Sequence, residues 1–227
     1  MAAGSGNRMK INANKVYLTL KAQQIPALYY PLAAFEKNNY IDEIVIVVRR
    51  EDDEEVKNMV NHERFPQKPV KIVIGGGERY ESVYNGLLET TGDIVLIHDG
   101  ARPLLKQRFI SDCVEAMDTY KGAAVGIENV DQLYVADENG FFVSKIEGTV
   151  YRIQTPQCFH TNIIKECHEK VADKSKVKDD SMLLEACGYK FTILSGHESN
   201  IKITHASDAI IAESLILQDE EIFNLFA

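Results

Sequence analysis

Short apolar runs alternate with segments of helical periodicity along the first half of the chain. The apolar runs at Ile44–Val48, Val70–Ile74, 93–98 and 123–127 are rich in β-branched residues and predict strands buried on both faces. Between them, apolar residues recur every three or four positions, which predicts helices at 24–38, 51–61, 78–88 and 107–119. This alternation indicates an α/β protein with a mostly parallel sheet and helices on both faces.

Two of these helices carry local signals at their beginnings. Pro31 lies near the middle of the helix predicted at 24–38, where a proline kinks the helix or makes it begin late. The segment 51–61 opens with acidic residues, which are favourable at a helix amino terminus.

The alternation of strands and helices is interrupted after residue 127. Segments 132–136 and 141–146 flank Asn139-Gly140, the sequence signature of a β-hairpin. Because an isolated two-stranded ribbon is marginally stable in water, we expect this one to pack against a second subunit. Helices at 161–171, 179–187 and 207–217 and a strand at 190–194 follow. We expect one domain over residues 1–227, with a projecting β-arm at about 129–153.

Composition restricts the classes of partner. The chain has 227 residues and a formal net charge of −9, which argues against a nucleic-acid surface but allows a small phosphorylated ligand. Its four cysteines have no metal-binding spacing and are expected to be reduced thiols. No signal peptide and no apolar run of membrane-spanning length is visible, so we expect a cytoplasmic protein without membrane partners.

The first motif that could take part in binding or catalysis is AAGSGNRM at residues 2–9, followed by Lys15. Small residues let backbone N–H groups approach phosphate oxygens, and cations stabilise the charge that develops during transfer. The Gly-Ser-Gly segment is also compatible with an ordinary turn that binds no ligand. It is not a Walker loop, because no Gly-Lys-Ser/Thr follows it.

Two further motifs follow predicted strands. Gly75-Gly76-Gly77, with Ser82 in the next helix, permits close approach to a flat base and is equally compatible with a plain strand-to-helix connection. HDGARP at 98–103 ends another strand, where Asp99 is a candidate Mg²⁺ ligand. We expect Arg102 to order this loop by pairing with Asp99, and His98 to be packed and hydrogen-bonded rather than a base.

QTPQ at 154–157 and NIKIT at 200–204 complete the set, and neither specifies a function alone. In this order, with GGGERYESV at 75–83, the motifs resemble the 2-C-methyl-D-erythritol 4-phosphate cytidylyltransferase family and its relatives, the ribitol 5-phosphate cytidylyltransferases. The resemblance covers nearly the whole chain. It implies a Rossmann-like sheet, a homodimer formed through the β-arm, and the use of Mg²⁺ and CTP in isoprenoid biosynthesis.

The resemblance also implies residue roles. The nucleotide is contacted by Ala2, Ala3, Gly4 and Gly6 at the triphosphate, by Gly76, Gly77 and Ser82 at the cytosine, and by Gly100. Charge on the α-phosphate is stabilised by Arg8 and Lys15, the catalytic pair. Asp99 holds Mg²⁺, and Lys202 lies near the acceptor phosphate.

Three positions depart from the family pattern. No apolar strand precedes the Gly4 turn, so we expect exposed edges on the neighbouring strands and a chain truncated from a longer protein. Glu147 replaces an arginine that grips the acceptor phosphate of the partner subunit, and Gln132 replaces a threonine. Lys145 lies two residues before Glu147, on the same strand face, and is our candidate substitute in acceptor binding.

These observations support three functional hypotheses. The first is a CTP-dependent transferase acting on 2-C-methyl-D-erythritol 4-phosphate; the second is the same chemistry on ribitol 5-phosphate or another polyol phosphate. The third is a non-catalytic relative that binds nucleotide or a partner protein. A Rossmann oxidoreductase is disfavoured, because Met9 stands where the G-x-G-x-x-G motif requires its last small residue.

Overall fold

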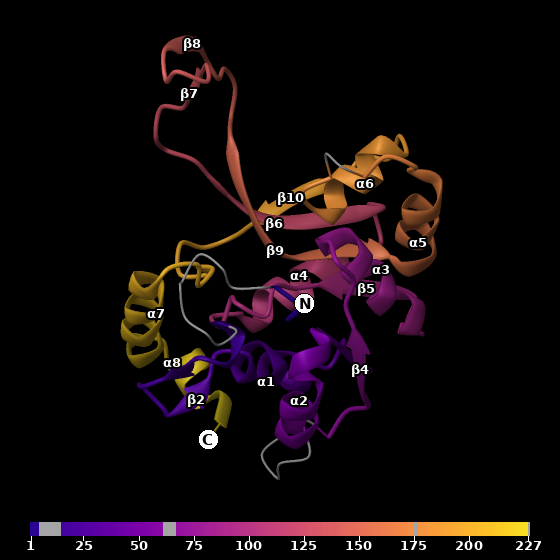
Figure 1. Cartoon of the computed structure of the whole chain (residues 1–227), viewed down its shortest axis with the longest axis vertical. Helices are drawn as coiled ribbons and strands as arrows, with labels where there is room; N and C mark the ends of the chain where they lie inside the picture. Colours follow the sequence, from indigo (N-terminus) through magenta and orange to yellow (C-terminus); the bar gives the residue numbers. More distant parts are fainter. Residues whose placement is uncertain (5–14, 61–66, 175–176, 227) are drawn as a thin grey trace.

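The computed structural model describes residues 1–4, 15–60, 67–174 and 177–226, with only the backbone for Lys15. It is a mixed α/β structure in which helices surround the strands (Figure 1). Within the described ranges, every helix is too short or too polar to cross a membrane.

The strands form two larger groups. One is a parallel pair, β3 (Ile44–Val48) with β4 (Val70–Ile74). The other is a four-stranded sheet in the order β10 (Thr192–Ser195), β6 (Gly122–Glu128), β9 (Tyr151–His160) and β5 (Ile94–Ile97). β10 runs parallel to β6, whereas β9 runs antiparallel to both of its neighbours. The second sheet is therefore mixed, and its central strand β9 is an element that the hydrophobic pattern did not predict.

The predicted helices are present with shifted ends: α1 (Tyr29–Lys37), α2 (Asp53–Val60), α3 (Arg79–Glu89), α4 (Gln107–Ala116), α5 (Thr161–Lys170), α6 (Asp180–Ala186) and α7 (Ala206–Gln218), followed by α8 (Glu220–Phe223). Pro31 lies in the first turn of α1, so the helix begins late and is not kinked. The residues before it form a small antiparallel pair, β1 (Thr19–Leu20) with β2 (Ile25–Pro26).

The core lies on both faces of the four-stranded sheet, because successive residues of a strand point to opposite sides. Cys158 of β9 packs in one cluster with Phe109 and Ile110 of α4. Its neighbour Phe159 packs in another cluster, with Leu183 of α6. α4 therefore covers one face of this sheet, and α6 covers the other.

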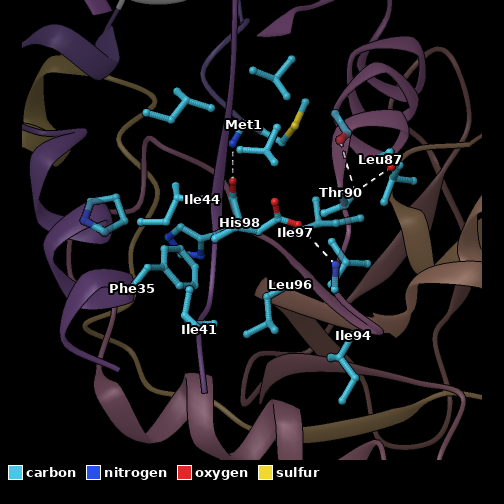
Figure 2. Close-up of a pocket in the computed structure, with 18 of the residues that line it drawn as sticks. Met1, Phe35, Ile41, Ile44, Leu87, Thr90, Ile94, Leu96, Ile97 and His98 are labelled. Carbon is cyan, nitrogen blue, oxygen red and sulfur yellow. Dashed lines mark hydrogen bonds between the residues drawn. The ribbon is translucent and has the colours of Figure 1, made fainter. Parts of the chain in front are cut away.

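An apolar slot separates β3 from β5. A cavity of about 350 Å³ lies between Ile44–Val47 and Ile94–His98, with Leu32 of α1 and Leu87 of α3 also in its wall (Figure 2). No described strand pairs with the edges of β3 and β5 that line this slot. We expected exposed edges on these strands; the edges are unpaired, but they line a cavity and most of their residues are buried.

Met1 and Ala2 bridge one end of this slot. The amino group of Met1 donates to the carbonyl of His98 at 2.7 Å, a contact visible in Figure 2. Ala2 N–H donates to the carbonyl of Val47 at 2.7 Å, and the carbonyl of Met1 accepts from Gly100 N–H at 2.9 Å. These two residues thus join the carboxyl ends of β3 and β5.

The predicted hairpin is present as β7 (Tyr134–Ala136) and β8 (Phe142–Lys145), which pair antiparallel and project from the rest of the molecule (Figure 1). Gly140 takes a positive φ of 84° in the connecting turn, a conformation that glycine adopts without steric cost. Phe141 and Phe142 are 71% and 66% exposed, so large apolar side chains lie on the surface of this projection.

Candidate active site

The loop after β5 is built around a neutral histidine. His98 is buried; its Nε2 lies 3.1 Å from the carbonyl of Arg102, and its Nδ1 lies 3.0 Å from Oγ1 of Thr155. A carbonyl only accepts hydrogen bonds, so Nε2 carries the proton and Nδ1 accepts from the threonine. Burial lowers the pKa of His98 to about 3. The prediction that His98 is packed and hydrogen-bonded is confirmed.

Asp99 is an ionised carboxylate surrounded by cations. Nζ of Lys202 donates to Oδ2 of Asp99 at 2.6 Å, and Nε of Arg102 lies 3.8 Å from the same oxygen. Burial alone would raise the pKa of Asp99, but Lys202, Arg79 and Arg102 outweigh it and hold the pKa of this carboxyl well below its usual range. The motifs HDGARP and NIKIT, about 100 residues apart in the sequence, therefore meet in one ion pair.

Arg102 orders the same loop. Its Nη1 donates to the carbonyl of Asn200 at 2.6 Å, and Nδ2 of Asn200 donates to the carbonyl of Thr155 at 2.9 Å. Oγ1 of Thr155 in turn accepts from Asp99 N–H at 3.1 Å. The predicted ordering role of Arg102 is confirmed, and QTPQ supplies the residue that fixes the backbone of Asp99.

The glycine-rich segments converge beside this loop. A Cβ at Gly75 would lie 2.8 Å from Cβ of Ala3 and 2.7 Å from Oγ of Ser82. Gly76 N–H donates to Oγ of Ser82 at 3.1 Å, so the first turn of α3 holds the glycine turn in place. Gly100 packs against Met1, whose carbonyl oxygen would be 3.1 Å from a Cβ at that position.

Most of the described residues predicted to bind nucleotide therefore lie around the ends of β3, β4 and β5. Gly4 is exposed and continues the segment that contains Ala3, and Gly77 is exposed at the entrance to α3. Gly6 and Arg8 lie outside the described residues, and so does the side chain of Lys15. The predicted catalytic pair thus stays a prediction.

Lys145 lies apart from this cluster, on the projecting hairpin. Its Nζ lies 3.0 Å from Oε1 of Glu147, and both side chains are largely exposed. Lys145, Glu147 and Gln132 line a polar hollow of about 420 Å³ at the base of the hairpin. These three hairpin positions therefore share one surface, whereas Lys202, which is also predicted to lie near the acceptor phosphate, belongs to the cluster around Asp99.

Sequence reasoning assigned no role to a second ion pair near the glycine turn. Nη1 of Arg79 lies 2.8 Å from Oδ2 of Asp180, the first residue of α6, whose side chain is fully buried. Arg79 was visible within the GGGER motif. Asp180 lies in no motif, and only the fold brings it to Arg79.

Asp99 fits a magnesium ion as one ligand among several. In the described part of the chain, no three His, Cys, Asp or Glu side chains gather in a metal-binding group. Mg²⁺ is commonly held by one or two carboxylates together with substrate phosphates and water, so a protein cage is not required. Oδ2 of Asp99 accepts from Lys202, and no described residue is hydrogen-bonded to Oδ1, which leaves one charged oxygen for a metal.

Comparison with known proteins identifies the relatives of this chain. The protein-family model for 2-C-methyl-D-erythritol 4-phosphate cytidylyltransferase matches residues 1–218. The chain belongs to this family. It is 40% identical over 217 residues to the 2-C-methyl-D-erythritol 4-phosphate cytidylyltransferase of Caldanaerobacter subterraneus, covering 94% of this chain and 95% of the relative. The Clostridium beijerinckii protein of the same name is 40% identical over 220 residues, with 95% and 96% covered.

Solved structures of the same family share the fold. The 4-diphosphocytidyl-2C-methyl-D-erythritol synthase of Anaerococcus prevotii matches with a TM-score of 0.82 and 28% identity, covering 96% of this chain and 93% of that one. The 2-C-methyl-D-erythritol 4-phosphate cytidylyltransferase of Thermus thermophilus matches with a TM-score of 0.73 and 25% identity, over 94% and 95%. The family resemblance expected from the motifs is confirmed.

Proposed function

We propose that this chain is a cytidylyltransferase that transfers CMP from CTP to 2-C-methyl-D-erythritol 4-phosphate and releases pyrophosphate, a step in isoprenoid biosynthesis. Membership of the family supports this activity. The observation that carries this proposal is the ion pair of Asp99 with Lys202 beside the glycine-rich segments. Oδ2 of the ionised Asp99 lies 2.6 Å from Nζ of Lys202. Ligand sites in open α/β sheets gather at such carboxyl strand ends.

The chemistry needs positioned charges rather than a covalent intermediate. A phosphate oxygen of the acceptor attacks the α-phosphorus of CTP and forms a new P–O bond. The bond from the α-phosphorus to the bridging oxygen breaks, and pyrophosphate leaves with the electron pair. Arg8 and Lys15 are proposed to stabilise the charge on the α-phosphate, and Lys202 to hold the acceptor phosphate, so that the reacting atoms lie in line.

The remaining proposed roles concern recognition of CTP. Ala2, Ala3, Gly4 and Gly6 would line the triphosphate, with Gly100 beside them; the backbone N–H groups of Ala3, Gly4 and Gly6 would face the phosphates, whereas the N–H of Ala2 is bonded to Val47 and holds the segment in place. Gly76, Gly77 and Ser82 would read the cytosine, the glycines through backbone groups. The hydrogen bond from Gly76 N–H to Ser82 fixes the turn against α3 and so supports a preformed site for the base. Because that N–H is engaged, Gly76 would contact the base through its carbonyl.

Oδ1 of Asp99, together with phosphate oxygens of CTP, would hold Mg²⁺, which supplies positive charge to the phosphates during transfer. The low pKa of the Asp99 carboxyl supports this assignment, since a metal ligand must be ionised at neutral pH.

Acceptor binding is proposed to require a homodimer. The hairpin exposes large apolar side chains and carries Lys145, which we propose as a contact to the acceptor bound by the partner subunit. Oε1 of Glu147 lies 3.0 Å from Nζ of Lys145 and would repel the phosphate of any of these acceptors. Because Glu147 departs from the family pattern at the acceptor side, ribitol 5-phosphate or another polyol phosphate is the alternative acceptor. The four free cysteines are compatible with the proposed cytoplasmic location.

Parallel assays of pyrophosphate release from CTP with Mg²⁺ test the acceptor, using 2-C-methyl-D-erythritol 4-phosphate, ribitol 5-phosphate and no acceptor. We expect release with the first acceptor only. Release with ribitol 5-phosphate alone would establish the alternative, and CTP binding without release from any mixture would favour a non-catalytic relative.

Lys145→Ala should raise the KM for the acceptor and leave the KM for CTP unchanged. The same KM for the acceptor in the variant and in the wild type would show that Lys145 does not contact the acceptor.

A further inference from the structure

Arg79 is fixed by a carboxylate that has no access to water. The Asp180 side chain that pairs with it is 0% exposed, whereas about a third of the Arg79 side chain is open to solvent. Removing the cation would leave an uncompensated buried charge, which is strongly destabilising. Asp180 therefore pairs with Nη1 of the guanidinium, and part of the Arg79 side chain is left open to solvent.

Asp180 is itself held at the start of α6. Its backbone N–H donates to Oε1 of Gln157 at 3.2 Å, and Gln157 is buried on β9. Nε2 of His168 lies 3.8 Å from Oδ1 of Asp180, but burial lowers the pKa of this histidine to about 4, so it is neutral and does not compete for the carboxylate. The second glutamine of QTPQ thus anchors the residue that anchors Arg79.

The guanidinium stands at the glycine turn of the candidate site. Arg79 is the first residue of α3 and is separated from Gly75–Gly77 only by Glu78, and Oγ of Ser82, one turn later, accepts a hydrogen bond from Gly76 N–H. Lys202, which is proposed to hold the acceptor phosphate, donates one of its N–H groups to Asp99, and Arg102 donates to Asn200. Among the described residues, Arg79 has no hydrogen-bond or ion-pair partner other than Asp180, so most of its N–H donors are available to an anion.

We propose that Arg79 is a phosphate-binding residue for the nucleoside triphosphate, and that Asp180 is the positioning residue that aims it. The proposal rests on the proposed function, because the nucleotide is CTP only if the chain is a cytidylyltransferase. A guanidinium already fixed by a buried carboxylate loses little conformational freedom when it binds phosphate, which favours affinity. The influence of Arg79 on the pKa of Asp99 is consistent with its place in the same site.

Binding of CTP and of cytidine to the full chain, measured by calorimetry with Mg²⁺ present, separates phosphate binding from a purely structural role. Arg79→Gln and Asp180→Asn should each raise the Kd of CTP about tenfold and leave that of cytidine unchanged. The double variant should bind CTP no more weakly than Arg79→Gln alone, because Asp180 acts through Arg79.

The matched control is Asp52→Asn, which breaks a similar pair outside the site. Asp52 is buried and accepts from Arg49 at 2.7 Å. This variant should lower the melting temperature and keep the wild-type ratio of CTP to cytidine affinity. Wild-type protein that binds no CTP would overturn the proposed function, and this role with it. Wild-type binding with an unchanged affinity ratio in Asp180→Asn would overturn only the role of Arg79 and Asp180.

Discussion

His98 and His168 are two buried imidazoles that the folded chain keeps neutral. Burial lowers the pKa of His98 to about 3 and that of His168 to about 4, whereas an imidazole in the unfolded chain titrates near 6.5. Because the unfolded chain binds more protons below pH 6.5, the stability contributed by these residues is complete above that pH. It is lost as the pH falls toward 4.

We expect the free energy of unfolding to be lower at pH 5 than at pH 7 by about 2 kcal/mol for each of these histidines. Urea unfolding of the wild type at pH 8, 7 and 5 measures this difference, and the step from pH 8 to pH 7 is the internal control. His168→Gln should remove about half of the histidine-linked loss. The same loss in the variant as in the wild type would show that His168 is not the titrating group.

At the scale of elements, the sequence pattern succeeds where one local signal decides the structure. β-branched runs placed β3 and β4, and Asn139-Gly140 placed the hairpin. β9 was missed because QTPQ interrupts its apolar pattern with two glutamines and a proline. Pairing with β5 and β6 makes this segment a strand, and such long-range contacts are not encoded in local periodicity.

Part of the candidate site could likewise be predicted from local sequence, and part could not. Asp99 and the glycine turn were named from their residue types and their place after predicted strands, and Lys202 from the family resemblance; their roles stay predictions. The connections between them, such as Thr155 to Asp99 and Asp180 to Arg79, depend on residues far apart in sequence. No spacing rule in one sequence predicts these contacts.

The slot between β3 and β5 gives a prediction at this scale. Joining an extended apolar segment of the length of β3, 5 residues, to Met1 should fill the cavity and pair with both strand edges. We expect the free energy of unfolding to increase by about 2–5 kcal/mol, which is the effect of filling the space of one large buried side chain. An equally long Gly-Ser segment is the control in denaturant unfolding. Equal stability of the two extended proteins would contradict pairing in the slot.

At the scale of the whole molecule, the exposed aromatic residues of the hairpin are the surface on which the proposed dimer depends. Phe141 is 71% exposed, and burying one such side chain contributes about 1.5–3 kcal/mol. We expect the wild type to sediment as a dimer at micromolar concentration, and Phe141→Ser to raise the dissociation constant about tenfold or more. Ile210→Ser, which alters an exposed side chain on α7, is the control. A wild type that sediments as a monomer would contradict the dimer.

The claim that this molecule is a CTP-dependent transferase is tested most directly by the initial rate of pyrophosphate release. The assay uses CTP and 2-C-methyl-D-erythritol 4-phosphate with and without Mg²⁺, on the wild type and on Asp99→Asn. We predict release that requires both the acceptor and Mg²⁺ in the wild type, and a rate at least about 100-fold lower in Asp99→Asn. CTP bound by the wild type without pyrophosphate release at any Mg²⁺ concentration would contradict the assignment.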